Sequence, residues 1–148
     1  MSRKKILIID ELVVARSFMN SLIRNLEYVV IDTHTNFNFD LINDAYDLVI
    51  TDPRIFDIEP RGNKDLYLDT LKRLQSNGAH LWFISTKQKS WIDHFIGKIK
   101  GEHSYALKPL NTYLLIKYAG KFLGVASMLD QRIEIILNYS CIGPVFND

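Results

Sequence analysis

Four short apolar runs along the chain each end in a polar residue, acidic after two of them and a serine and a lysine after the others. The runs are followed, in chain order, by Asp10 and Glu11, by Asp52, by Ser85, and by Lys108 and Pro109. Helical patterns separate the runs, and strands that alternate with helices are typical of βαβ units in a parallel sheet. Ligand sites in open parallel sheets lie outside the carboxyl ends of the strands. We therefore expect these polar side chains to converge although they are far apart in sequence.

Hydrophobic periodicity predicts five strands, each followed by a helix. The runs over residues 5–9, 47–51 and 80–85 are apolar on both faces, as interior strands of a parallel sheet require. Asn111 is expected to cap a final helix that starts at Thr112. The predicted strands span residues 5–9, 29–33, 47–51, 80–85 and 104–107, and the predicted helices span 13–26, 39–45, 63–75 and 89–98 and begin again at 112.

Composition limits the classes of partner. The 148 residues are 47% hydrophobic, enough for the core of one domain. The 18 basic and 17 acidic residues leave a net charge of +1, which marks neither nucleic acid nor an anionic membrane as partner. No apolar stretch approaches the roughly 20 residues that span a bilayer, and the single Cys141 fits a reducing compartment. We expect a cytoplasmic protein without membrane insertion or direct binding of nucleic acid.

The chain is expected to form one domain over residues 1–124, and residues 125–148 are expected to extend its last helix and end in a tail. One apolar face of the extension would be lined by Leu129, Ile133, Ile136 and Leu137, and such a face must be buried. Two partners for it stay open, the parent domain and a second copy of the chain in a homodimer. The segment is too short for a DNA-binding domain, so we expect output through protein contacts.

The order and types of the strand-end residues resemble a response-regulator receiver domain, the phosphorylatable switch of two-component signalling. The resemblance covers about residues 3–124. It implies an α/β fold of the flavodoxin-like, or CheY-like, type, with a doubly wound five-stranded parallel sheet in strand order 2-1-3-4-5 and helices on both faces. The residues that carry it are Asp10, Glu11, Asp52, Ser85, Tyr105, Lys108 and Pro109.

Three carboxylates, those of Asp10, Glu11 and Asp52, are expected at the ends of neighbouring strands. Repulsion raises the pKa values of clustered carboxyl groups unless a cation is bound. Mg²⁺ suits such a place because it prefers oxygen ligands and keeps several waters. The resemblance implies that Asp52 accepts a phosphoryl group from a histidine kinase, as carboxylates can. It also implies that the backbone carbonyl of Arg54 is a further metal ligand.

Further roles follow from the resemblance alone. Ser85 would donate a hydrogen bond to a phosphoryl oxygen, and Lys108 would pair with the phosphoryl group as a point charge. Tyr105 stands at the position of the switch aromatic, whose ring turns inward when the Ser85 hydroxyl moves toward phosphate. The peptide bond between Lys108 and Pro109 is expected to be cis.

The loop after Asp52 departs from the family pattern. Receivers usually have Met-Pro and then Gly there, whereas this chain has Pro53, which lacks a backbone N–H. Glu11 stands where Asp is commoner, and its extra methylene shifts the carboxylate. Arg54 and Lys87 stand at positions that flank the path of attacking water in the family. We expect the two basic side chains either to slow hydrolysis of the phosphoryl group or to be solvated surface charges.

The leading interpretation is a stand-alone receiver, a signalling protein rather than an enzyme. Its partners would be a histidine kinase or phosphotransfer protein and a downstream target protein. An alternative, favoured by Pro53 and Glu11, is a pseudo-receiver that acts as a phosphorylation-independent interaction or dimerisation module. A phosphatase of the haloacid dehalogenase type would need a second Asp where Arg54 stands. A dinucleotide-binding enzyme is disfavoured because no Gly-rich turn follows the first strand.

Overall fold

Five parallel strands form one sheet in the order β2-β1-β3-β4-β5, which is the predicted order. The structure is a computed structural model, and it describes residues 4–26, 29–33, 45–57, 62–97, 99–101 and 103–125. The elements are β1 (Lys4–Ile9), α1 (Leu12–Asn25), β2 (Val29–Thr33), β3 (Leu48–Thr51), the 3-10 helix η2 (Pro53–Phe56), α2 (Gly62–Ser76), β4 (His80–Ser85), α3 (Lys89–Ile96), β5 (His103–Leu107) and α4 (Thr112–Leu123).

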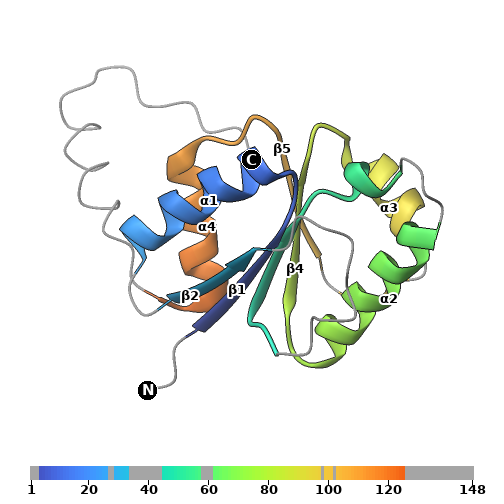
Figure 1. Cartoon of the computed structure of the whole chain (residues 1–148), viewed down its shortest axis with the longest axis horizontal. Coiled ribbons are helices and arrows are strands. Elements are labelled where there is room, and N and C mark those ends of the chain that lie inside the picture. The colour runs from blue at the N-terminus through green and yellow to red at the C-terminus, as the bar shows by residue number, and fades with distance from the viewer. Residues whose placement is uncertain are drawn as a thin grey trace.

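Helices cover both faces of the sheet, with α1 and α4 on one side and α2 and α3 on the other (Figure 1). Alternate residues of a strand point to opposite faces. In β1, Ile6 and Ile8 pack with apolar residues of α1 and α4, and Leu7 and Ile9 pack with those of α2 and α3. All four side chains are fully buried. The doubly wound arrangement therefore explains why the interior strands are apolar on both faces.

Helix α4 has the cap that the sequence predicts. The side chain of Asn111 accepts a hydrogen bond from the backbone N–H of Tyr113 at 2.7 Å. The helix ends at Gly124, whose φ of 67° lies in the left-handed region that glycine enters without strain. The peptide bond between Lys108 and Pro109, in the loop before α4, is cis as expected. The loop and the helix start are thus fixed next to the end of β5.

The fold class and the five predicted strands are confirmed, and the strand boundaries shift by no more than a residue. The helix predicted over 89–98 ends earlier, at Ile96, because Gly97 ends it with a positive φ. Two predicted segments, the helix over 39–45 and the extension over 125–148, lie outside the described residues apart from Ala45 and Val125. Within the described ranges, none of the helices has the length and apolar character that crossing a bilayer demands.

Candidate functional site

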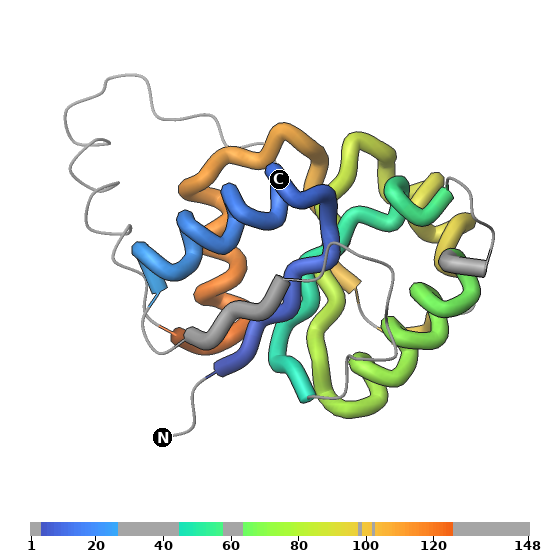
Figure 2. The backbone as a smooth tube through the Cα atoms, in the orientation of Figure 1, coloured from blue at the N-terminus to red at the C-terminus, as the bar shows by residue number. Residues whose placement is uncertain are grey.

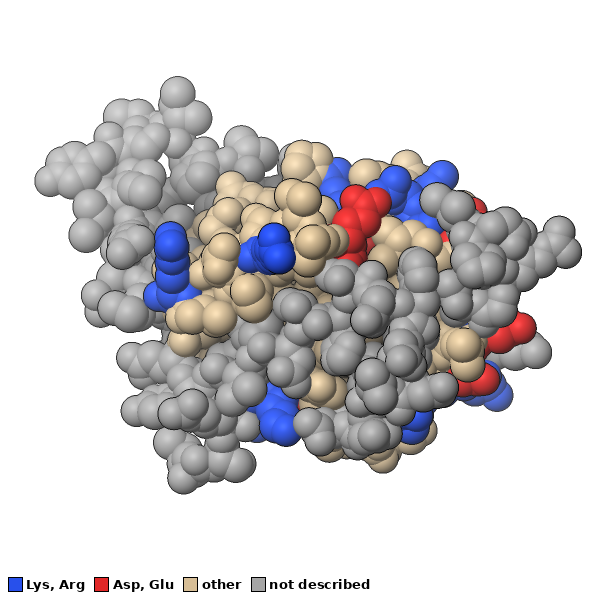
Figure 3. All heavy atoms as spheres, in the orientation of Figure 1, with Lys and Arg blue, Asp and Glu red and all other residues tan. Residues whose placement is uncertain are grey.

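The carboxyl ends of four strands meet at one edge of the sheet. Asp10, Asp52 and Lys108 follow directly after β1, β3 and β5, and Ser85 is the last residue of β4. The pairing registers bring these ends nearly level, and the loops that leave them lie along the upper edge in Figure 2. Charged side chains of both signs are visible at that edge (Figure 3). The predicted convergence of the strand-end residues is therefore present.

Lys108 joins two of the carboxylates. Its ammonium nitrogen Nζ lies 2.8 Å from Oδ2 of Asp10 and 2.8 Å from Oδ2 of Asp52. Both aspartate side chains are fully buried, and the lysine side chain is 12% exposed. Water and salt screen such buried, charge-assisted hydrogen bonds only weakly. One cation therefore contacts two acidic residues that come from neighbouring strands and offsets part of their negative charge.

Each of the two aspartates also receives one backbone hydrogen bond. The N–H of Glu11 donates to Oδ1 of Asp10 at 2.7 Å, and the N–H of Arg54 donates to Oδ1 of Asp52 at 2.9 Å. The second of these bonds caps the 3-10 helix η2. The chain thus compensates for the missing N–H of Pro53 with the N–H of the next residue.

Burial is the largest influence on the pKa of Asp10. Loss of water around its carboxyl group raises the pKa above the ordinary 3.8, whereas the hydrogen bond and the charge of Lys108 lower the pKa only in part. The neighbouring charge of Asp52 adds to the increase. Additional positive charge beside these two carboxylates would favour their ionised forms. The electrostatics therefore favour a cation at this point.

The third predicted carboxylate lies apart from the other two. The side chain of Glu11 is 58% exposed, and its Oε1 lies 3.6 Å from Nη2 of Arg54. Nε of the same Arg54 side chain lies 3.7 Å from Oδ2 of Asp52. Among the described residues, no three Asp, Glu, His or Cys side chains gather closely enough to hold a metal ion together. The structure thus brings together two of the three predicted acidic residues and inserts a basic side chain beside them.

Ser85 is fully buried at the end of β4. Its Oγ accepts a hydrogen bond from the N–H of Lys87 at 3.1 Å, and its carbonyl oxygen accepts one from the N–H of Lys108 at 2.8 Å. The ammonium of Lys87 lies 5.4 Å from the centre of the Trp91 ring. Of the two basic residues expected near the phosphoryl position, the structure brings Arg54 to the carboxylates and turns Lys87 toward Trp91. Their effect on hydrolysis stays a prediction.

Solved structures similar to this chain come from signalling proteins. The chemotaxis protein CheY4 of Vibrio cholerae is 16% identical and has a TM-score of 0.61, over 82% of this chain and 99% of its own. A response regulator from Thermotoga maritima is 17% identical with a TM-score of 0.59, over 82% and 98%. The signal receiver domain of an HD domain-containing protein from Pseudomonas fluorescens Pf-5 is 14% identical with a TM-score of 0.63, over 92% and 94%.

This chain has a receiver-domain fold. No protein-family model matches the sequence, and no curated protein matches it either. Identities of 14% to 17% establish the fold alone. Any statement about phosphorylation, metal or partners therefore depends on the side chains at the strand ends.

The oxygen atoms at this edge of the receiver fold fit a hard divalent cation. Asp10 and Asp52 present two carboxylates to one point, because the same ammonium contacts both. Mg²⁺ typically binds one or two carboxylates and keeps several water ligands. The carbonyl oxygen of Arg54 accepts a hydrogen bond from the N–H of Asp57 at 3.2 Å, which leaves one lone pair. Glu11 would have to leave the arginine to join this set.

Tyr105, the predicted switch aromatic of the receiver fold, is tied to helix α3. Its hydroxyl donates a hydrogen bond to Oδ1 of Asp93, and Nζ of Lys89 lies 3.0 Å from Oδ2 of the same carboxylate. The hydrogen bond from Tyr105 lowers the pKa of Asp93. Burial and the bond to Asp93 raise the pKa of Tyr105. The sequence indicated the tyrosine but gave no signal for its anchor on α3.

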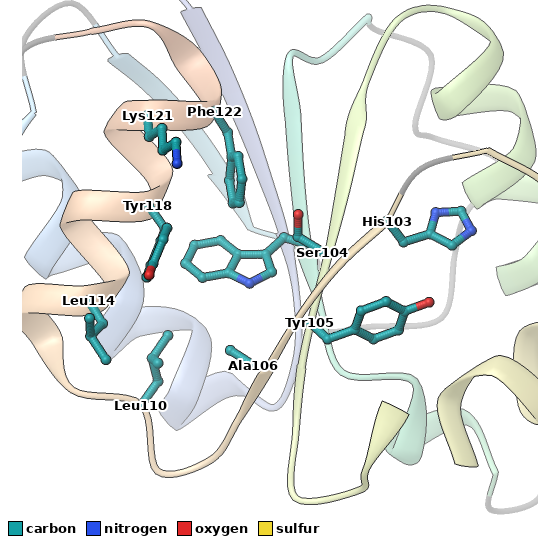
Figure 4. A pocket seen from close by; sticks show the side chains of 10 residues that line it. His103, Ser104, Tyr105, Ala106, Leu110, Leu114, Tyr118, Lys121 and Phe122 are labelled. Carbon is teal, nitrogen blue, oxygen red and sulfur yellow. The ribbon is translucent and has the colours of Figure 1, made fainter. Parts of the chain in front are cut away.

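A cavity of about 370 Å³ lies between β5 and α4, away from the charged strand ends. Ser104, Tyr118 and Phe122 line it. Figure 4 shows that the rings of His103 and Tyr105 lie on the other side of β5 from α4. His103 and Tyr105 thus border the cavity, but their rings point away from α4.

A buried polar pair next to Asp52 is another feature that the sequence did not reveal. Oγ1 of Thr51 and the hydroxyl oxygen of Tyr67 lie 2.8 Å apart, and the Tyr67 ring stacks on Phe56 with centroids 4.0 Å apart. Burial raises the pKa of Tyr67 well above its ordinary value of 10.0. These contacts fasten α2 to β3 and η2. They hold in place the turn that carries Asp52 and Arg54.

Proposed function

We propose that this chain is a receiver that accepts a phosphoryl group on Asp52 and signals through protein contacts. The observation that carries the proposal is the environment of this carboxylate. It is buried, Nζ of Lys108 lies 2.8 Å from Oδ2, and the N–H of Arg54 lies 2.9 Å from Oδ1. Strand β3 also lies between β1 and β4, so Asp52 has Asp10 on one side and Ser85 on the other.

In the proposed reaction, a carboxylate oxygen of Asp52 attacks the phosphorus atom of a phosphohistidine. The phosphorus–nitrogen bond breaks, and its electron pair leaves with the imidazole. Negative charge on the phosphoryl oxygens is what the protein must stabilise in such a transfer. Lys108 would pair with these oxygens, and the hydroxyl of Ser85 would turn from accepting the Lys87 N–H to donating to one of them. The protein would carry out phosphotransfer and slow autodephosphorylation only.

Mg²⁺ is the proposed cofactor. Asp10, Asp52 and the carbonyl oxygen of Arg54 would hold it, with Glu11 as a further ligand. When bound, the ion would supply neutralising charge between the carboxylates and the phosphoryl oxygens. The raised pKa of Asp10 supports this part of the proposal, because it marks a place where positive charge is favourable.

The proposed partners are a histidine kinase or phosphotransfer protein and a downstream target. Apolar surface beside Lys108 supports the first. Val13, at the start of α1, is 80% exposed, and it lines a groove of about 370 Å³ together with Phe18, Lys108 and Leu110. The bond between Tyr105 and Asp93 supports the second, because movement of the ring would release a contact on the surface of α3.

Intact mass after incubation with acetyl phosphate and Mg²⁺ tests the proposal. We expect one phosphoryl adduct on the wild-type protein, and none on Asp52→Ala or after treatment with a chelator. An established receiver incubated in parallel serves as the positive control. Labelling of that control without an adduct on this protein would contradict the proposal.

The second candidate function is a pseudo-receiver that binds a partner without phosphorylation. The contact between Glu11 and Arg54 favours it, because it holds one predicted metal ligand away from Asp10 and Asp52. This candidate predicts that Asp52→Ala binds the same partner with the same affinity as the wild type, with or without Mg²⁺. A partner that binds only the phosphorylated protein would exclude it.

A further inference from the structure

The guanidinium of Arg54 contacts the two predicted metal ligands that lie on its side of the site. Nη2 is 3.6 Å from Oε1 of Glu11, and Nε is 3.7 Å from Oδ2 of Asp52. The side chain is 37% exposed, and Nζ of Lys108 lies 2.8 Å from the same Oδ2. Two cations of the chain's own therefore face the carboxylates.

The contacts of Arg54 are ion pairs without hydrogen bonds. Both distances exceed the range of N–H···O hydrogen bonds. Nε is buried, yet it has no hydrogen-bond partner within the part of the chain that the structure describes. A buried donor without a partner is costly. Charge therefore attracts the guanidinium to the carboxylates, but no hydrogen bond fixes it there. Lys108, in contrast, makes hydrogen bonds to both aspartates.

We propose that Arg54 is a resident cation that competes with a divalent ion for the carboxylates of Asp52 and Glu11. The inference rests on the proposed function of the site and adds a regulatory element to it. Binding of the metal requires the guanidinium to leave both carboxylates. The exposed position of the side chain gives it room to move into solvent, and Glu11 becomes free as a ligand at the same time.

The balance of charge supports this competition. Asp10, Glu11 and Asp52 carry three negative charges, and Lys108 and Arg54 carry two positive ones. A divalent ion that enters beside both cations would leave an excess of positive charge among groups that are partly shielded from water, where charge interactions are strong. Departure of the arginine removes this excess. In the metal-free state Arg54 therefore reduces the net negative charge of the site, and the same contact lowers its affinity for a metal ion.

Titration with Mn²⁺ alone, followed by the electron paramagnetic resonance signal of the free ion, tests the proposal. We expect Arg54→Met, which keeps the aliphatic stem, to bind Mn²⁺ about tenfold more tightly than the wild type or better. Arg54→Lys keeps the charge and should stay closer to the wild type than Arg54→Met does. Lys87→Met removes the same charge from a side chain that faces Trp91, and its affinity should change by less than about twofold.

Equal or weaker binding by Arg54→Met would overturn the proposal, and so would a similar gain in Lys87→Met. Failure of both the wild type and Arg54→Met to bind Mn²⁺ would overturn it as well. Labelling with acetyl phosphate separates this failure from that of the proposed function. If the wild type takes up a phosphoryl group at Asp52 while Arg54→Met binds metal no better, only the role of Arg54 is wrong.

Discussion

Two loops reach Asp52, and they hold it in different ways. The loop between β5 and α4 supplies Lys108, whose Nζ makes 2.8 Å hydrogen bonds and whose side chain is 12% exposed. The turn η2 supplies the side chain of Arg54, which stays 3.7 Å from the carboxylate and is 37% exposed. Both side chains carry one positive charge. Two cations of equal charge in one site thus differ in burial and hydrogen-bond geometry, and the proposed exchange of Arg54 depends on this difference.

The largest expected effect comes from removing the fixed cation. Lys108→Met leaves two buried carboxylates without the ammonium that contacts both. We expect the free energy of unfolding of the metal-free protein to fall by about 3 kcal/mol, because an uncompensated buried charge is strongly destabilising. Urea denaturation in the presence of a chelator measures the loss. Lys87→Met is the matched control, and equal stability of the two variants would remove the distinction between fixed and exposed cations.

The second prediction concerns Asp10, the other carboxylate that Lys108 contacts. Its pKa is raised above 3.8 in the folded chain, chiefly by burial, so the folded protein binds the proton more tightly than the unfolded chain. Stability therefore falls as the pH rises from 3.8 through the raised pKa. Asp10→Asn should abolish this part of the pH dependence and stabilise the metal-free protein at neutral pH, because the buried charge is removed. A variant less stable than the wild type at neutral pH would contradict the prediction.

The smallest effect on stability is expected from the exposed ion pair of α3. Lys89 pairs with Asp93, whose side chain is 42% exposed and accepts a hydrogen bond from Tyr105. Asp93→Asn should cost about 0.5 kcal/mol at neutral pH, as exposed pairs contribute little. Because the hydrogen bond from Tyr105 lowers the pKa of Asp93, the contribution disappears as the pH falls below 3.8.

Thermal unfolding of Asp93→Asn and wild type across this pH range measures the difference. Asp69→Asn, an exposed change on α2, serves as the control. A loss that persists unchanged in strong acid would show that the carboxylate charge is not the cause. Lys108→Met, Asp10→Asn and Asp93→Asn together compare three charges in one domain. These are a buried cation, a buried carboxylate that Lys108 partly compensates, and an exposed carboxylate.

Much of the fold could be predicted because its signals are local. The apolar runs and their periods defined the strands, and the residue after each run defined the strand end. Parallel pairing then brings Asp10, Asp52, Ser85 and Lys108 to one edge without any knowledge of packing. The cap at Asn111 is likewise a property of a few neighbouring residues.

The remaining features depend on the directions of side chains. The sequence placed Glu11 with the two aspartates, but its longer side chain reaches Arg54 instead. The anchor of Tyr105 on Asp93 joins two elements, and a lone aspartate on a helix surface gives no signal of it. The pair of Thr51 and Tyr67 is hidden for the same reason. These contacts follow from rotamers and tertiary packing, which periodicity does not encode.

The measurement that tests the account most directly is the position of the phosphoryl group. Asp10 and Asp52 each have one backbone donor and share Lys108. The placement of β3 beside β4, which brings Ser85 next to Asp52, favours Asp52 as the acceptor. Reduction of the phosphorylated protein with borohydride converts an acyl phosphate to homoserine, which tandem mass spectrometry of peptides locates. We predict homoserine at position 52 alone. Homoserine at position 10, the corresponding reduction product of glutamate (2-amino-5-hydroxypentanoic acid) at position 11, or no reduced acidic residue at all would contradict the account.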